Sequence, residues 1–172
     1  MLTGITGSKF FPGSGGWGII LGLYGYREIV PRLNAFLTGA YTITPAENYT
    51  PTASSVAGYT DYSIADSYSG RGGFEYLVWP SHPVWLSLAG RIDGVPVNDL
   101  AGGSQGFRRP GHSVAIDPGV SASYKSWTFS FNTPVAVSRA RLQNVTELAT
   151  GAPAAAAGFA EIQVLFNISK RF

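Results

Sequence analysis

Apolar and polar side chains alternate along most of this chain with a period of two residues. From Ser126 to Val137 one set of alternate positions is apolar, and the other carries short polar side chains. The apolar set is Trp127, Phe129, Phe131, Val135 and Val137, and the polar set is Ser126, Thr128, Ser130, Asn132 and, just beyond the segment, Ser138. Successive side chains of a strand point to opposite faces, so this pattern predicts a β-strand with one apolar and one polar face.

Further segments show the same alternation. They are Leu33–Ile43, Phe74–Val78, Val84–Ile92, Val114–Ala122 and Ala160–Phe172, and Trp17–Tyr26 is also strand-like but rich in glycine. Helical periodicity is hard to find, and the alanines from Ala154 to Ala157 could at most form a short turn. We therefore expect an all-β protein of about seven strands. Several are near or above the ~9–11 residues with which a tilted strand crosses a bilayer.

The predicted connections alternate in length. Short turns are expected at Arg27–Pro31, Pro80–Pro83 and Tyr124–Ser126, and long polar loops at Thr44–Gly70, Gly94–Arg109 and Arg139–Ala157. In an antiparallel up-and-down barrel all short turns then lie at one end and all long loops at the other, as in transmembrane barrels. Five aromatic residues beside the short turns are expected to form a belt at one membrane interface, namely Tyr26, Trp79, Trp85, Tyr124 and Trp127.

The composition agrees with a surface that faces lipid. Charged residues make up 13% of the 172 residues, against about a quarter in soluble domains. The net charge is only +2 and the basic residues form no stripe along the chain, so we expect no nucleic-acid partner. The chain has no cysteine, which excludes disulfides and thiolate metal sites. Any single alternating strand also fits a soluble β-sandwich or lipid-binding barrel, and that alternative stays open.

The last strand resembles a known family feature. The segment from Ala160 to Phe172 alternates apolar and polar residues and ends in an aromatic residue. In this it resembles the C-terminal signal strand of bacterial outer-membrane β-barrel proteins, a group that includes porins and transporters. The resemblance implies a location in the outer membrane of a Gram-negative bacterium and recognition by the barrel-assembly machinery. The residues that carry it are Val164, Phe166, Ile168 and Phe172.

The domain organisation follows from the strand count. We interpret residues 1–172 as a single β-barrel domain that is the C-terminal portion of a longer chain. Bacterial single-chain barrels have an even number of strands, whereas about seven are visible here. Residues 1–16 show no signal peptide, and the predicted strand directions place them in an extracellular loop.

No catalytic constellation, cofactor motif or metal site stands out, so we do not expect an enzyme. His82 lies between two prolines in a predicted short turn, and His112, near a long loop, could meet Asp93 or Asp99. Polar residues opposite the apolar faces are instead expected to point into the lumen, because a charge that faces lipid costs about 2–4 kcal/mol for Arg or Lys. They are Arg32, Glu75, Arg91, Asp93, Asp117, Asn132, Glu161 and Gln163, with Arg171 near the terminus. They would either line an open pore or pair across a closed one.

The expected function is that of a passive pore or transporter for small solutes in the outer membrane. An alternative is a structural or adhesive barrel whose long loops bind partners outside the cell, for which the loop Tyr49–Tyr68 is the candidate surface. The expected partners are membrane lipid and lipopolysaccharide, whose phosphates Arg108 and Arg109 could meet.

Overall fold

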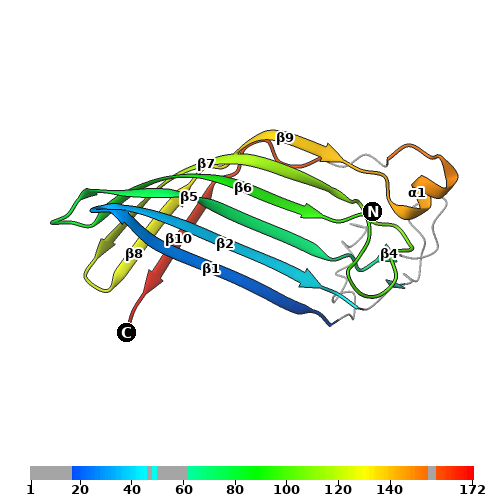
Figure 1. Ribbon diagram of the computed structural model, residues 1–172, viewed down its shortest axis with the longest axis horizontal. Helices are drawn as coiled ribbons and strands as arrows, with labels where there is room; N and C mark the ends of the chain where they lie inside the picture. The colour runs from blue at the N-terminus through cyan, green and yellow to red at the C-terminus, as the bar shows by residue number, and fades with distance from the viewer. Residues whose placement is uncertain (1–16, 46–47, 50–61, 155–157) are drawn as a thin grey trace, which may run out of the picture.

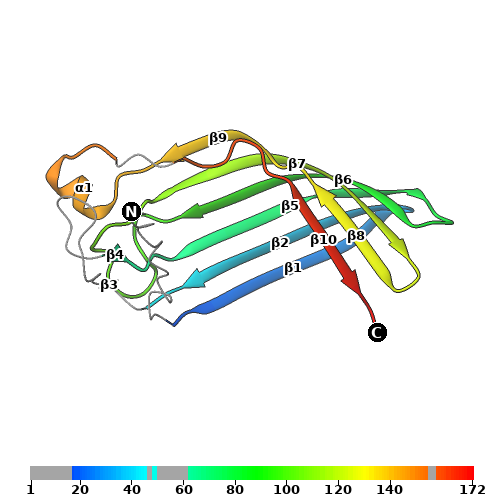
Figure 2. The same cartoon turned by 180° about the vertical axis from the view of Figure 1, so that it is seen from behind.

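A single antiparallel sheet dominates the computed structural model, which describes residues 17–45, 48–49, 62–154 and 158–172. Its strands lie in the order β1-β2-β5-β6-β7-β8-β10, and β9 also pairs with β7. The sheet curls into a half-barrel (Figures 1 and 2). The prediction of an all-β fold with antiparallel, consecutively paired strands is therefore confirmed. The strand bounds are β1 (Ile19–Val30), β2 (Leu33–Ile43), β5 (Ser67–Trp79), β6 (Val84–Val95), β7 (Gly111–Tyr124), β8 (Trp127–Asn132), β9 (Val135–Arg141) and β10 (Leu165–Lys170).

Three short elements lie apart from this sheet, at the end where the long loops gather. Strands β3 (Asn48–Tyr49) and β4 (Tyr62–Ser63) pair with each other. Helix α1 (Val145–Thr150) lies inside the predicted loop Arg139–Ala157 and was not predicted. Its sequence signal is a capping box, in which Asn144 accepts from the backbone of Glu147 and the Glu147 side chain accepts from the backbone of Asn144. Gly151 then ends the helix in the left-handed conformation. No helix in the described ranges is both long enough and apolar enough to span a membrane.

The predicted strand Ser126–Val137 forms, but as two pieces along β7. Strand β8 pairs with Gly119–Tyr124, and β9 pairs with Gly111–Ile116. The break falls at Thr133–Pro134, because a proline has no N–H to donate to the ladder. The break continues into the neighbouring segment, where Gln163 N donates to the Pro134 carbonyl at 3.0 Å and β10 begins only at Leu165.

A β-bulge places Ser138 on the opposite face of the sheet from the one predicted. Val114 pairs with Ser138, whereas the next residue, Ala115, pairs with Ala136. Val137 is therefore the extra residue, and Ser138 joins the face of Val114 rather than the polar face.

Two predicted connections change length. Strand β5 begins at Ser67, inside the predicted loop Thr44–Gly70, because its first half is too rich in glycine to show alternation. Strand β1 continues to Val30, so the turn predicted at Arg27–Pro31 is confined to residues 31–32, with Arg32 at a positive φ of 73°. The short turns predicted at Pro80–Pro83 and Tyr124–Ser126 are confirmed, at residues 80–83 and 125–126.

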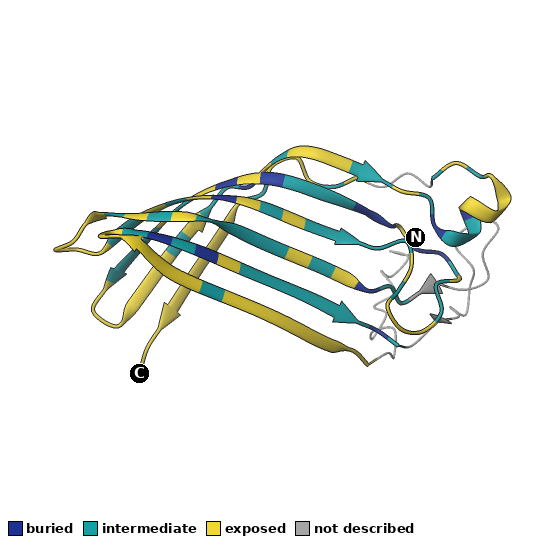
Figure 3. Ribbon diagram, viewed as in Figure 1, coloured by how far each residue is buried: buried dark blue, intermediate teal, exposed yellow. Residues whose placement is uncertain are grey.

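The two faces of the curled sheet differ in exposure and in chemistry. Between Leu86 and Asp93 on strand β6, exposure alternates residue by residue, with Leu86, Leu88, Gly90 and Ile92 exposed and the alternate residues more buried (Figure 3). Side chains on the inside of a curved sheet crowd one another, so the more buried face is the concave one. The register carries the same faces across the other strands. The convex face holds Leu37, Phe74, Leu88, Ile116 and Phe131, and the concave face Asn34, Arg71, Glu75, Arg91, Asp93 and Asp117.

Candidate functional site

The concave face gathers polar and charged side chains from five neighbouring strands. Ser69, Asp93 and Ser113 lie opposite one another on β5, β6 and β7, and the row below them contains Thr38, Arg71 and Arg91. Asn132 pairs with Gly119 at the β7–β8 border of the same face. The structure thus places Glu75, Arg91, Asp93, Asp117 and Asn132 together on one face of the sheet, and that this face lines a lumen stays a prediction. We treat this face as the candidate functional site.

An ion pair between Arg71 and Asp117 spans the middle of the face. Arg71 Nε donates to Asp117 Oδ2 at 2.6 Å, and the guanidinium lies 4.6 Å from the ring centroid of Phe36. The Asp117 side chain is 1% exposed and that of Arg71 26% exposed. The pair crosses β6 between β5 and β7, where the intervening residue is the small Ala89. A charge buried to this degree needs its partner.

Close packing beneath this pair requires a glycine on β5. A Cβ at Gly73 would lie 2.2 Å from the Leu88 carbonyl oxygen and 2.5 Å from the Ala89 Cα. Both are backbone atoms of β6 that cannot move aside. Gly73 therefore lets β5 and β6 approach closely at the height where Arg71 reaches across.

Arg91 and Asp93 form a second pair, closer to the loop end of the sheet. Arg91 Nε and Nη2 donate to the two carboxylate oxygens of Asp93 at 2.6 and 3.1 Å. Both side chains are partly exposed, at 25% and 35%. The bidentate geometry holds both charges in place, and their remaining hydrogen-bonding positions face open space.

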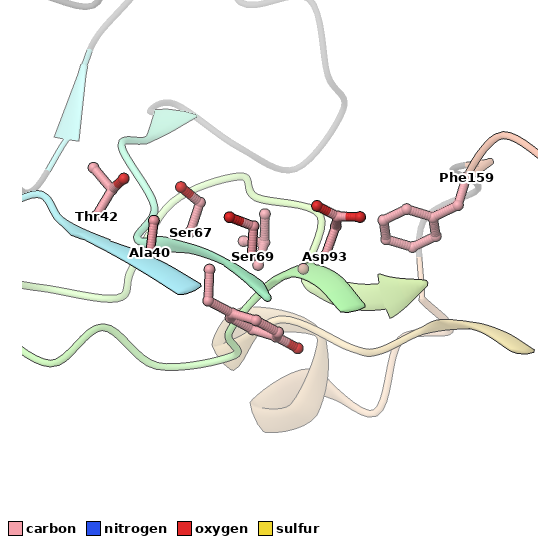
Figure 4. Close-up of a pocket in the computed structure, with 9 residues that line it drawn as sticks. Ala40, Thr42, Ser67, Ser69, Asp93 and Phe159 are labelled. Carbon is pink, nitrogen blue, oxygen red and sulfur yellow. The ribbon is translucent and has the colours of Figure 1, made fainter. Parts of the chain in front are cut away.

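Two hollows adjoin at this second pair. One, of about 320 Å³, lies toward the loops and is lined by side chains that include Thr42, Ser67, Ser69 and Phe159. The other, of about 230 Å³, contains Thr38, Arg71 and Arg91. They share Ala40, Ser69 and Asp93, so together they form one groove along the concave face. Figure 4 shows the larger hollow, with the ring of Phe159 beside Asp93.

Toward the short turns, Glu75 accepts hydrogen bonds from two other strands. The Tyr26 hydroxyl donates to Glu75 Oε1 at 2.8 Å, and Asn34 Nδ2 lies 3.4 Å from the same oxygen. This corrects the expected aromatic belt, because Tyr26 points to the concave face. Trp85, which pairs with Ser121, lies on that face as well. Trp79, Tyr124 and Trp127 remain as outward candidates for an interfacial belt.

Four residues that were predicted to point into the lumen lie outside the strands. Arg32 is exposed in the β1–β2 turn, outside both strands, and its backbone N–H donates to Glu28 Oε1 at 3.3 Å. Glu161 is largely exposed and lies 3.8 Å from Arg139. Gln163 borders a small hollow next to Arg91 and Pro134. Arg171, beyond β10, donates its backbone N–H to the Ser126 carbonyl at the turn end.

A buried network holds the long loops together at the other end. Asp66 is fully buried and accepts from the backbone of Thr44 and Leu100 and from the Tyr41 hydroxyl. Its own N–H donates to Asp99, which binds Arg108 through both carboxylate oxygens at 2.8 and 2.5 Å. The Arg108 side chain is 1% exposed. The prediction that Arg108 meets lipopolysaccharide is therefore wrong, because this arginine is buried in an internal ion pair.

Arg109, the other arginine of that prediction, lies on the surface, with its guanidinium 5.2 Å from the ring centroid of Phe107. A contact between Arg109 and lipopolysaccharide stays a prediction. The loop Tyr49–Tyr68, which was the candidate adhesive surface, lies largely outside the described residues.

The histidines are not brought into a catalytic arrangement. His112 pairs with Gly94 on the convex face, whereas Asp93 lies on the concave face and Asp99 is bound to Arg108. His82 lies in the 80–83 turn against the Trp79 ring. Among the described residues, no group of three His, Asp or Glu side chains is placed to hold a metal ion.

Arg71 is the site residue that the sequence analysis missed. It follows Gly70 and precedes two more glycines, between the predicted loop Thr44–Gly70 and the predicted strand Phe74–Val78. A signal was present in the alternate positions Ser69, Arg71, Gly73 and Glu75, which continue the polar face of the predicted strand Phe74–Val78 backwards. Glycine at the intervening positions hid the apolar half of the pattern.

The C-terminal strand has the predicted two faces. Phe166 and Ile168 pair with Phe131 and Phe129 on the convex face, and all four residues of the expected assembly signal are exposed. Comparison of the chain with protein-family models, curated proteins and solved structures gives no match.

Proposed function

We propose that this chain forms the wall of a bacterial outer-membrane β-barrel through which small polar solutes pass. The observation that carries the proposal is the division of one curled sheet into an exposed apolar convex face and a polar concave face with internally paired charges. In water, a face with Leu37, Phe74 and Leu88 exposed would be a large unprotected apolar patch. In a bilayer the same face meets hydrocarbon.

Strand length supports the membrane setting. Strands β1, β2, β5, β6 and β7 contain 11 to 14 residues. At about 3.3 Å per residue and a tilt of about 45°, strands of this length rise about 26–33 Å, enough for the apolar band of about 25 Å that transmembrane barrels present to lipid. The groove on the concave face then runs along the direction in which a solute would cross.

The test is conductance of the purified full-length gene product in a planar bilayer. Discrete, stable current steps are expected, and their absence from protein shown to be folded and inserted would overturn the pore. A second experiment addresses the membrane itself. The protein is expected in the outer-membrane fraction and to need detergent, and recovery from the soluble fraction without detergent would favour the soluble β-protein instead.

A second candidate is an adhesive barrel that presents a fixed surface outside the cell. The observation in its favour is the Asp66–Asp99–Arg108 network, which orders the loop between β6 and β7 from beneath. An ordered loop loses less conformational entropy when it binds a partner. A folded, inserted protein without conductance would favour this function.

A further inference from the structure

We infer that the groove on the concave face is a binding site for a neutral sugar, with room for two linked rings. The inference rests on the proposed function and specifies its solute. It depends on the charge balance of the groove, on its row of hydroxyl groups and on one aromatic ring.

The charges that border the groove cancel in pairs. Arg71 is bound to Asp117 and Arg91 to Asp93, each with an N–O distance of 2.6 Å. An ionic solute would have to compete with a partner already held in place. A neutral solute can instead use the lone pairs and N–H groups that the Arg91–Asp93 pair leaves open, and hydrogen bonds to charged groups are stronger than those between neutral groups.

Hydroxyl groups continue from this pair toward the loops. Thr42 lies opposite Ser67, and Ser69 lies opposite Asp93, on three neighbouring strands. Figure 4 shows these four side chains on the same side of the sheet, with Phe159 next in line. Each hydroxyl can both donate and accept, which matches the paired donor and acceptor character of a sugar hydroxyl. Ala40, which pairs with Ser69 and lies next to Thr42 on the same face of β2, adds only a methyl group to the lining of the hollow.

Phe159 supplies the apolar contact that a sugar ring requires. Its side chain belongs to the wall of the larger hollow, and its carbonyl accepts a hydrogen bond from Arg139 at 3.1 Å. A pyranose has C–H groups on its faces and hydroxyls around its rim. An aromatic ring at one side and hydroxyls along the floor therefore fit this solute better than a uniformly polar one.

Size favours a disaccharide. The larger hollow, of about 320 Å³, is at the lower end of the range of small-molecule sites. The second hollow adds about 230 Å³ and shares Asp93 with the first, so one ring can occupy each. Binding should be weak, because a solute that passes must also leave.

The experiment is a saturation-transfer NMR titration of the full-length protein with maltose. It uses lauryldimethylamine oxide micelles, which contain no sugar. Saturable binding with a Kd of about 1 mM is expected, with the strongest transfer to the ring C–H protons. Glucuronate, which carries a carboxylate where glucose has a hydroxymethyl group, should bind more weakly than glucose. Absence of saturable maltose binding, or tighter binding of glucuronate than of glucose, would overturn the inference.

Two variants and a matched control locate the site. Ser69→Ala and Phe159→Ala should each raise the Kd for maltose about fivefold, the effect of losing one favourable contact. Ser121→Ala makes the same change on the same face near the short turns, away from the groove, and should leave the Kd as it was. Equal Kd values for Ser69→Ala, Phe159→Ala and the parent protein would place any sugar elsewhere and overturn the inference.

The pore and the sugar site are tested by different outcomes, so one proposal can fail while the other holds. Current steps in a planar bilayer without maltose binding would leave the pore and remove the sugar site. Maltose binding at this groove without current would keep the sugar site and make the protein a sugar-binding barrel rather than a pore.

Discussion

At the scale of single residues, the Arg71–Asp117 pair is the most consequential contact of the concave face. Arg71→Ala should lower the free energy of unfolding by about 3 kcal/mol, because it leaves the buried Asp117 carboxylate without its cation. Asp117→Ala alone should cost less, since Arg71 is partly exposed and can reach water. Urea unfolding in lipid vesicles measures both. The double variant should be more stable than the sum of the two single effects predicts, and strict additivity would show that the pair is not coupled.

The Arg91–Asp93 pair governs the charge of the groove. Asp93→Asn leaves Arg91 uncompensated and should raise the chloride-to-potassium permeability ratio about twofold, because a single added charge in a narrow polar passage biases the local ion concentration. The reversal potential in a KCl gradient reports this ratio. Combining Asp93→Asn with Arg91→Gln should restore the parent value. An unchanged ratio in the single variant would mean that ions do not pass this pair.

The sequence predicted such residues where the alternation is regular and missed them elsewhere. Asp93 and Asp117 lie in strands whose opposite face is clearly apolar, so their side of the sheet was predictable. Tyr26 was misplaced because β1 carries apolar residues at both parities, with Ile19, Ile20 and Leu21 in succession. Its bond to Glu75 joins β1 to β5 across β2, a contact that no local pattern encodes.

At the scale of elements, a charged substitution on the convex face of a strand can show whether that face meets lipid or water. Leu88→Arg should destabilise the inserted protein by about 2–4 kcal/mol, because the charge would face hydrocarbon near the middle of the strand. Leu100→Arg is the matched control, since Leu100 is at least as exposed, 69% against 60%, but lies in the loop between β6 and β7. Unfolding in vesicles compares the two. Equal small effects would favour a convex face that meets water.

The Asp66 carboxylate connects the loop between β6 and β7 to the end of β2. Asp66→Ala removes the acceptor of the Thr44 and Leu100 backbone N–H groups and of the Tyr41 hydroxyl. Unpaired buried donors are costly, so this loop should open locally while the strands stay paired. Limited proteolysis should then cut within residues 96–106 at least tenfold faster than in the parent protein. Cleavage at the parent rate would show that other contacts suffice.

The alternation of apolar and polar residues predicted some element boundaries, whereas others depend on hydrogen bonding that the alternation does not show. Strand β2 was predicted to the residue, because only Gly39 interrupts its apolar face and Pro31 lies just before it. The split of the β8–β9 segment comes from the missing donor of Pro134, which alternation ignores. Helix α1 was not predicted because six residues are too few for a helical period to appear, although the residues of its capping box are present in the sequence.

At the scale of the whole molecule, the C-terminal strand yields a prediction about assembly rather than stability. Phe172 is fully exposed beyond β10, so Phe172→Ala removes few contacts. It should leave unfolding in vesicles unchanged but reduce the amount of protein in the outer membrane at least fivefold, if the assembly machinery recognises this end. Immunoblots of membrane fractions measure that amount. Equal amounts of parent and variant would argue against a signal at Phe172.

The sequence predicted a barrel-like class of fold, but not the detailed curl of the sheet. Alternation fixes which residues share a face, and connection lengths fix which strands are neighbours. The groove arises from pairings between residues far apart in the chain, such as Ala40 with Ser69 and Ser69 with Asp93. The place of Phe159 beside them depends on the path of the last loop, for which the sequence carries no periodic signal.

The strand break at Thr133–Pro134 has a mechanical consequence. Thr133 donates to the carbonyl of Pro118 on β7, and Gln163 donates to that of Pro134, so two prolines and the gap before β10 lie side by side on three neighbouring strands. Along this line the wall has fewer cross-links per unit length than above or below it. Strands β1, β2, β5 and β6 continue unbroken past this height, so the line forms a crease only in the part of the sheet made by β7 to β10, and bending of that part should concentrate there. In hydrogen–deuterium exchange, amides along the crease should exchange sooner than those at the centres of β5 and β6.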